Sequence, residues 1–255
     1  MIANYHSHTY RCRHASGTET EYVEAAIYRG LKIFGFSDHT PQYFPGDYYS
    51  FMRMYPNELE DYCNTVRTLR SNYRNRIEIP LGLEAEYYPA TWDEMYARAK
   101  DAGIEYLILG QHWLGNEQNE HGSGGATADE ALLRRYCHQV MDGLSTGVFT
   151  YLAHPDLFRF TGDREIYRKH MKELARFCRQ GNIPLEVNLL GLYCNKHYPS
   201  SEFFAIAAEE GCSVILGLDA HAPEHIISTQ CEEKVLEMIR HYGLKLLDTA
   251  QLRPL

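Results

Sequence analysis

The chain has few of the features that mark secreted, membrane-bound or disulfide-stabilised proteins. Its seven cysteines are an odd number, are scattered and include no Cys-x-x-Cys pair, which favours free thiols in a reducing cytosol over a disulfide framework. No stretch approaches the ~18 consecutive apolar residues of a membrane span, and the first residues lack a basic start and an apolar signal core. We therefore expect a soluble, cytoplasmic protein with no membrane partner.

Positive charge is also scarce in this sequence. The 25 Lys and Arg residues are outnumbered by 34 Asp and Glu residues, and the net charge is -9. This balance argues against a broad surface for nucleic acid or anionic lipid, so no nucleic-acid partner is expected. An anionic substrate would need a local reversal of the charge, which bound divalent cations provide.

Short apolar runs and amphipathic stretches alternate along the chain. The apolar runs are apolar almost throughout, as is typical of parallel strands buried on both faces, and they cover residues 1–6, 33–37, 77–83, 106–110, 149–153, 184–188 and 213–218. The amphipathic stretches predict helices over residues 19–29, 56–74, 91–102, 128–147, 163–180, 200–210 and 231–242. This alternation, without a break in composition, predicts an α/β fold in which residues 1–255 form one parallel, barrel-like domain.

Local signals support these boundaries. Thr18 and Glu21 have the spacing of a capping box at the start of the first helix, and glycines at 30, 103, 181 and 211 lie where helices are expected to end. Residues 115–128 are rich in Gly, Asn and Ser and predict a mobile loop at the mouth of the barrel.

Every expected strand ends in an imidazole, a carboxylate or both. These strand-end residues are His6 and His8, Asp38 and His39, Glu84 and Glu86, His112, His154 and Asp156, Glu186, and Asp219 and His221. The C-terminal ends of parallel barrel strands form one face, which carries the active site in barrel enzymes. Histidine and carboxylate ligands without thiolate favour Zn, Mn or Fe, and their number exceeds the need of one ion. The pattern predicts a multinuclear metal centre suited to the hydrolysis of phosphate esters.

The motifs around these residues resemble the polymerase-and-histidinol-phosphatase (PHP) superfamily, and most closely its histidinol-phosphatase branch. They are His6-Ser7-His8, Cys12-x-His14-Ala15-Ser16-Gly17-Thr18, Phe36-Ser37-Asp38-His39-Thr40-Pro41, Gly82-Leu83-Glu84, His154-Pro155-Asp156-Leu157 and Asp219-Ala220-His221. They span nearly the whole chain in the order of the family. The resemblance implies a distorted, seven-stranded (β/α)7 TIM-like barrel.

The resemblance also implies three divalent metal ions, which would be Zn, Mn or Fe. In this arrangement the first ion is held by His6, His8, Glu84 and Asp219, the second by Glu84, His112 and His154, and the third by His14, His39 and His221. The implied catalytic residues are those that hold a metal-bridging hydroxide for attack on phosphorus: His6, His8, Glu84, His154 and Asp219. The implied partner is a small phosphorylated substrate, L-histidinol phosphate, which would be converted to L-histidinol in histidine biosynthesis.

Other strand-end residues are expected to support the ligands. The Gly-x-Glu match favours Glu84 over Glu86 as the ligand, and Asp38 is expected to orient its neighbour. Glu186 and Asn188 either line the pocket or are structural. Five other histidines are expected to be ordinary surface or packing residues away from the strand ends: His121, His138, His170, His225 and His241.

Phosphate binding also needs hydrogen-bond donors other than metal ions. Arg159 is the best candidate, because a guanidinium binds phosphate oxygens with two parallel hydrogen bonds. Histidinol phosphatases usually carry Gly-Leu-Arg after the sixth strand, whereas this chain has Gly191-Leu192-Tyr193, followed by Lys196. We therefore regard Arg159, Lys196 and Tyr193 as the candidate substrate-binding residues.

Three other functions are compatible with parts of the pattern. The chain could be a PHP phosphoesterase acting on another phosphomonoester or on a phosphodiester, or a non-catalytic metal-binding module. An amidohydrolase-type deaminase also begins with His-x-His in a barrel. That class, however, would have eight strands and no Ser-Asp-His on the second one.

Overall fold

The computed structural model of the chain describes residues 1–118 and 121–255, and its main sheet is entirely parallel. In spatial order this sheet contains β3 (Phe36–His39), β4 (Leu81–Ala85), β5 (Tyr106–Leu109), β6 (Phe149–Leu152), β7 (Leu185–Asn188), β8 (Ser213–Gly217) and β9 (Lys245–Leu247). A separate two-stranded sheet pairs β1 (Ala3–Asn4) with β2 (Ile33–Phe34).

The segment that follows β1 connects the two sides of the strand array. The backbone oxygen of Ser7 accepts a hydrogen bond from the amide of Ser37 on β3, and the amide of His8 donates to the oxygen of Ala220 just after β8, both at 2.9 Å. The first half of β8 pairs instead with β9. The predicted distorted TIM-like barrel is therefore confirmed, and the distortion lies after β8, where Ala220 pairs with Ser7 and not with β9.

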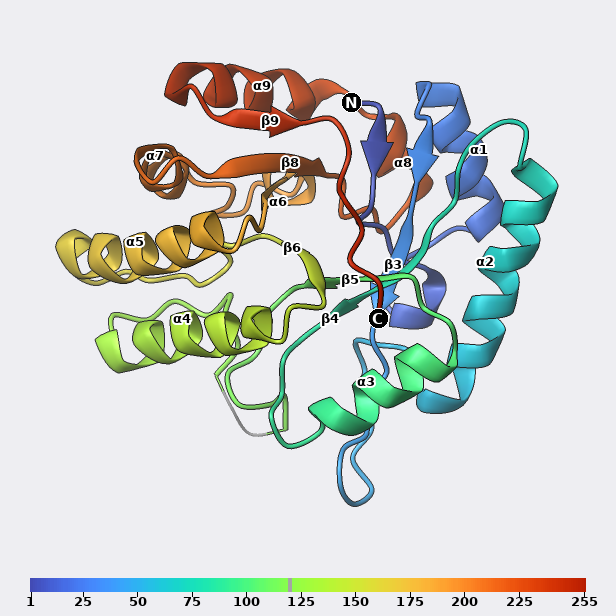
Figure 1. Cartoon of the computed structure of the whole chain (residues 1–255), viewed down its shortest axis with the longest axis horizontal. Coiled ribbons are helices and arrows are strands. Elements are labelled where there is room, and N and C mark those ends of the chain that lie inside the picture. The colour runs from blue at the N-terminus through green and yellow to red at the C-terminus, as the bar shows by residue number, and fades with distance from the viewer. Residues whose placement is uncertain (119–120) are drawn as a thin grey trace.

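Helices surround the strands on the outside of the molecule (Figure 1). The longer ones are α1 (Glu19–Arg29), α2 (Leu59–Tyr73), α3 (Trp92–Asp101), α4 (Glu130–Ser145), α5 (Arg164–Gln180), α7 (Ser201–Glu209) and α9 (Gln230–Tyr242). Shorter turns are α6 (Leu189–Tyr193), α8 (Pro223–Ile227) and the 3₁₀ helices η1 (Tyr10–Cys12) and η2 (Pro56–Glu58). None of the helices in the described parts of the chain has the length and apolar content to cross a bilayer.

Aromatic and aliphatic side chains fill the interior of the barrel beneath the strand ends. Tyr5, Tyr106 and Tyr151 form this inner core together with Ile215, and the C-terminal segment covers it through Leu252. The hydroxyl of Tyr106 donates to the backbone oxygen of Tyr5 at 2.9 Å. Figure 1 shows the C-terminus over the middle of the strands. The barrel is thus closed at one end and leaves its polar strand ends at the other.

Most predicted elements are confirmed, with differences that have physical causes. The expected strand 33–37 is two strands separated by Gly35, where an added Cβ would lie 2.4 Å from the Tyr106 hydroxyl. The strand β9 was not predicted. The capping box is confirmed, since Thr18 and Glu21 exchange hydrogen bonds at the start of α1. Of the predicted mobile loop 115–128, residues 119 and 120 lie outside the described residues, and Glu117 is buried.

Candidate metal centre

Glu84, near the end of β4, lies at the centre of the strand-end cluster. Its side chain is 1% exposed. One carboxylate oxygen, Oε1, is 2.8 Å from His154 Nε2 and 3.6 Å from His112 Nε2. The other, Oε2, is 3.0 Å from His39 Nδ1. Imidazoles from three different strand ends therefore approach the two oxygens of this one carboxylate.

Two glycines allow buried carboxylates to lie across the neighbouring strand. A Cβ added to Gly110, just after β5, would lie 1.9 Å from Glu84 Oε1. A Cβ added to Gly217, at the end of β8, would lie 1.7 Å from Glu186 Oε1. Only glycine leaves room for these carboxylates at the two positions.

His6, His8 and Asp219 converge on the same point. His8 Nε2 is 3.0 Å from Asp219 Oδ1, and His6 Nε2 is 3.4 Å from that oxygen and 3.5 Å from Glu84 Oε2. Asp219 and His154 have φ angles of 50° and 26°, in the left-handed region that disfavours side chains. Such backbone strain is concentrated at functional sites, where surrounding structure holds it in place.

A second group of imidazoles faces the open side of this cluster. The Nε2 atoms of His221 and His14 lie 3.0 Å apart, and the ring of His221 stacks on that of His8 with centroids 4.0 Å apart. Nitrogens of His14, His39 and His221 all lie within 4.8 Å of one another. Two ring nitrogens this close need a proton or a cation between them.

Glu186, Asn188 and Asp38 lie behind the candidate ligands. Glu186 Oε1 is 2.7 Å from His6 Nδ1, and its Oε2 accepts a hydrogen bond from the backbone amide of His154 at 2.9 Å. Asn188 Nδ2 donates to Glu186 Oε2 and to Asp219 Oδ2, both at 3.0 Å. Of the two interpretations of Glu186 and Asn188, pocket lining or a structural role, these contacts favour the structural role.

Asp38 lies behind the adjacent ligands. Its Oδ1 accepts from the backbone amide of His39 at 2.8 Å and lies 3.4 Å from His8 Nδ1. A carboxylate in this position can hold the orientation of an imidazole ligand.

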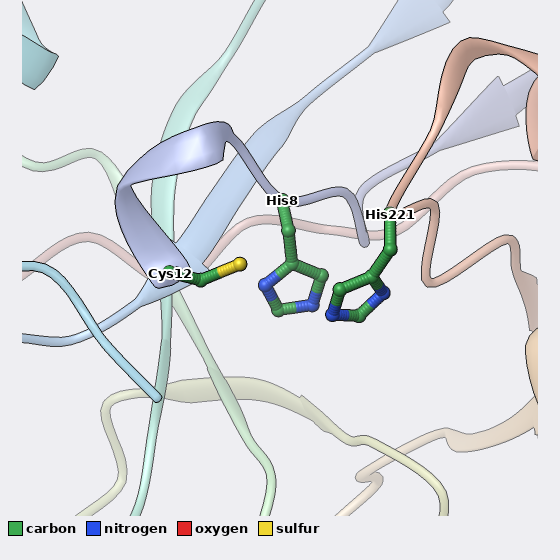
Figure 2. Close-up of side chains that lie close together, drawn as sticks. All are labelled: His8, Cys12 and His221. Atoms are coloured by element: carbon green, nitrogen blue, oxygen red, sulfur yellow. The ribbon is translucent and has the colours of Figure 1, made fainter. Parts of the chain in front are cut away.

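Cys12, on η1, lies beside the cluster and was not among the expected site residues. Figure 2 shows its sulfur on one side of the His8 ring and His221 on the other. A nitrogen of each ring and the sulfur lie within 4.8 Å of one another. The thiol accepts from the backbone amides of His14 and Ala15, and burial raises its pKa. The short Cys12-x-His14 spacing was the sequence signal that could have identified this residue.

The charges of the cluster are strongly coupled. Burial alone would raise the pKa of Glu84, but the surrounding imidazoles, led by His112, hold it well below its usual range. Burial lowers the pKa of His39 to about 3. Burial would also lower the pKa of His8, but hydrogen bonds to Asp219 and Asp38 raise it to about 9. Without a cation, the carboxylate of Glu84 is therefore ionised, His39 is neutral and His8 carries a proton.

Metal binding is consequently expected to release protons. At pH 7.5 the metal-free protein holds a proton on His8, because its pKa of about 9 lies above that pH. A metal ligand must be deprotonated, so each chain should release at least one proton on binding Zn²⁺, and affinity should fall as the pH falls. Titration calorimetry in buffers of different ionisation enthalpy measures this number. A buffer-independent enthalpy would contradict the expectation.

Several buried ligand atoms have no hydrogen-bond partner among the described residues. They are His6 Nε2, His39 Nδ1 and Glu84 Oε2, and all three face the centre of the cluster. Leaving such polar atoms buried and unpaired is costly. Imidazole nitrogens and carboxylate oxygens are the donors that Zn, Mn and Fe accept, so these residues fit divalent metal ions.

The candidate phosphate-binding residues Arg159 and Lys196 are exposed near the cluster. Both cations act on His197, whose pKa is lowered first by burial and then by their charges. The ring of His197 packs against Tyr198, and Tyr198 packs against His154 with centroids 6.1 Å apart. Arg159 and Lys196 thus share the neighbour His197, which adjoins His154 through Tyr198.

Tyr193 lies on another side of the mouth. The residue is 46% exposed, and the centroid of its ring lies 4.7 Å from that of His225. His225 Nδ1 accepts a hydrogen bond from the backbone amide of His221 at 3.2 Å. The expectation that His225 lies away from the strand ends was therefore wrong, since α8 folds back over the end of β8.

The other histidines lie at the surface or in packing contacts. His138 and His241 are exposed, and His121 packs against Phe158. His170 is buried on α5, with Nε2 2.9 Å from Glu130 Oε1. At these four positions the surface and packing locations agree with the expectation.

Known proteins are similar to this chain in sequence and in fold. The chain is 30% identical to a probable histidinol-phosphatase from Deinococcus radiodurans over 243 residues, 88% of each chain. A probable histidinol-phosphatase from Schizosaccharomyces pombe is 24% identical over 256 residues, 89% of this chain and 82% of that one.

Two solved structures superpose over nearly the whole chain. A putative histidinol phosphatase from Listeria monocytogenes has a TM-score of 0.76 at 17% identity, covering 91% of this chain and 99% of that one. The histidinol phosphate phosphatase from Lactococcus lactis, solved with Zn, L-histidinol and phosphate, has a TM-score of 0.72 at 20% identity, covering 96% and 95%. The family model of the PHP domain matches residues 4–189. The chain belongs to the PHP family.

Proposed function

We propose that the chain is a metal-dependent phosphomonoesterase that hydrolyses L-histidinol phosphate to L-histidinol and inorganic phosphate, a step of histidine biosynthesis. The observation that carries the proposal is the cluster around Glu84, in which both carboxylate oxygens face imidazoles from different strands. The relative from Deinococcus radiodurans, named a probable histidinol-phosphatase, supports the choice of substrate.

The cluster has enough ligands for three divalent ions. The proposed first set is His6, His8, Glu84 and Asp219, the second is Glu84, His112 and His154, and the third is His14, His39 and His221. Zn, Mn and Fe all suit these donors, and Zn is present in the structure of the Lactococcus lactis enzyme. Divalent ions held there would supply the Lewis-acid chemistry that activates water and neutralises the charge of a phosphoryl group.

Residues behind the proposed ligands hold the orientation of those ligands. Glu186 contacts the ring of His6 and the backbone of His154, so it keeps two proposed ligands in place from behind. Asn188 links Glu186 to Asp219. Preorganised groups of this kind act without rearranging during the reaction, which is how an enzyme favours the transition state.

The substrate phosphate is proposed to be bound by exposed cations at the mouth. Arg159 can offer two parallel hydrogen bonds to phosphate oxygens, and Lys196 lies in the same region through their shared neighbour His197. Tyr193, on the side of His225, occupies the place where the histidinol-phosphatase branch usually has arginine. We propose that its phenol faces the substrate there.

The direct test is phosphate release from L-histidinol phosphate with Mn²⁺ or Zn²⁺ supplied, using p-nitrophenyl phosphate for comparison. Efficient turnover of L-histidinol phosphate is expected, and it should be lost in His154→Ala, because that substitution removes an imidazole that contacts Glu84. Hydrolysis of p-nitrophenyl phosphate alone would support the phosphomonoesterase activity and contradict L-histidinol phosphate as the substrate. Metal binding without hydrolysis of either ester would favour a binding module.

A further inference from the structure

Arg53, in the segment between β3 and η2, is buried and uses every N–H of its guanidinium. The side chain is 2% exposed. Nη1 donates to Glu86 Oε2 at 2.9 Å and to the backbone oxygen of Thr40 at 3.0 Å. Nη2 donates to Glu86 Oε1 at 2.8 Å and to Glu117 Oε2 at 2.6 Å, and Nε donates to Glu117 Oε2 at 3.1 Å. Lysine cannot reproduce this set, because it lacks the planar fork and has three N–H donors in place of five.

The bidentate partner of Arg53 holds a proposed metal ligand. Glu86 Oε1, which accepts from Arg53, also lies 3.0 Å from His112 Nδ1. With that nitrogen donating to the carboxylate, His112 Nε2 presents its lone pair to the cluster, 3.6 Å from Glu84 Oε1. A second hydrogen bond of this kind sets the tautomer and the ring orientation of a histidine ligand.

Another partner of Arg53, the backbone oxygen of Thr40, belongs to a residue that follows one proposed ligand and is hydrogen-bonded to the backbone of a second. Thr40 follows His39, and both its amide and its hydroxyl donate to the backbone oxygen of Glu84, at 2.9 and 2.6 Å. The guanidinium therefore contacts Thr40, whose hydrogen bonds to the backbone of Glu84 link the end of β3 to β4 beside the proposed ligands. Movement of Arg53 would disturb His39 and Glu84 as well as His112.

The remaining partner, Glu117, comes from the loop after β5. The guanidinium lies between the carboxylates of Glu86 and Glu117, so the buried group has more negative than positive charge. The Tyr48 hydroxyl also donates to Glu117. Arg53 thus joins the segment between β3 and η2 to the loop after β5 and connects both to the centre.

We propose that Arg53 is a positioning residue of the metal centre, which fixes Glu86 and through it the orientation of His112. The inference rests on the proposed function in one respect, that His112 is a metal ligand. It goes beyond that function in assigning a role to a residue that contacts neither the proposed ions nor the mouth. Its prediction concerns metal affinity, which is measured without substrate.

The test compares Arg53→Lys with Arg70→Lys. Arg70 makes a similar bidentate pair with Glu105, at 2.8 and 2.6 Å, and its Nε donates to the backbone oxygen of Ile79, but this pair is at the surface away from the cluster. Chelator competition is expected to show the weakest-bound Zn²⁺ held about 10- to 100-fold less tightly in Arg53→Lys, as is usual when the support of a ligand is lost. Arg70→Lys should bind like the wild type.

A second variant tests the inference if Arg53→Lys does not fold. Glu117→Gln removes one of the two carboxylates that hold the guanidinium and leaves the bidentate pair with Glu86 in place. It is expected to weaken the same ion by about 10-fold. Co²⁺ absorption, which reports the ligand geometry, should change in the same variant.

Unchanged Zn²⁺ affinity and Co²⁺ spectra in the variant that folds, even with a lower Tm, would overturn the inference and leave Arg53 a purely structural residue. That outcome would not affect the proposed phosphatase, which depends on turnover by the wild type. Conversely, a wild-type protein that binds metal and hydrolyses no ester would refute the function and not the positioning role.

Discussion

Replacing Glu84 by glutamine is expected to lower kcat/KM for L-histidinol phosphate by about 10³-fold or more. Both oxygens of Glu84 face imidazoles, and the amide of glutamine keeps one oxygen and loses the charge. Metal ions supply several kcal/mol of charge stabilisation to a phosphoryl transition state, and each 1.36 kcal/mol corresponds to a factor of ten. The kinetics should be measured at saturating Mn²⁺, together with the metal content per chain.

Glu105→Gln is the matched control for this substitution. Glu105 pairs with Arg70 at the surface and accepts a hydrogen bond from the Leu81 amide at 2.9 Å, which the side-chain oxygen of glutamine can still accept, so the substitution removes one exposed ion pair and leaves the centre unchanged. Such pairs contribute at most about 1 kcal/mol. If Glu84→Gln kept the metal content and kcat/KM of this control, Glu84 would not be a bridging ligand.

The second large effect is expected from Gly110→Ala, which adds one carbon atom. The new Cβ would lie 1.9 Å from Glu84 Oε1, so the carboxylate must move out of contact with His154. Misplacement of a catalytic group by about 1 Å can cost 10²-fold in rate, and we expect a loss of at least about this size in kcat/KM. Because the added carbon overpacks the site, the free energy of unfolding of this variant should also fall by about 1–3 kcal/mol.

Gly124→Ala is the control, because nothing lies within 4 Å of a Cβ built at that position. It should retain the kcat/KM, metal content and free energy of unfolding of the wild type. Equal kcat/KM values for Gly110→Ala and Gly124→Ala would contradict the expected clash between the new Cβ and the carboxylate of Glu84.

The sequence was most informative where function depends on local strand geometry. In a parallel barrel the end of each strand faces the same mouth, so a ligand such as His154 or Glu84 could be located from one apolar run and the residue after it. The register that pairs His39 with Glu84 in neighbouring strands follows from the same regularity. The predicted strand ends therefore bring together most of the candidate cluster, whereas His14, in the loop after η1, was assigned from the family resemblance alone.

Other features depend on contacts between distant segments, which no local pattern encodes. Arg53 lies in an aromatic segment without helical or strand periodicity, and its importance appears only when Glu86 and Glu117 meet it in space. The strand β9 is short and partly exposed, so it lacks the apolar run of a buried strand. His225 reaches the site because α8 folds back after β8.

The pairing of the segment after β1 with the segment after β8 also affects biosynthesis. His8 contacts Asp219, a residue 211 positions further along the chain, and the neighbouring Ser7 pairs with Ala220. At a translation rate of ~5–20 residues per second, the first histidines leave the ribosome about 10–40 s before their partners are made. Until then the nascent barrel lacks Asp219 and His221, so the complete ligand set can form only after the chain has been synthesised as far as His221.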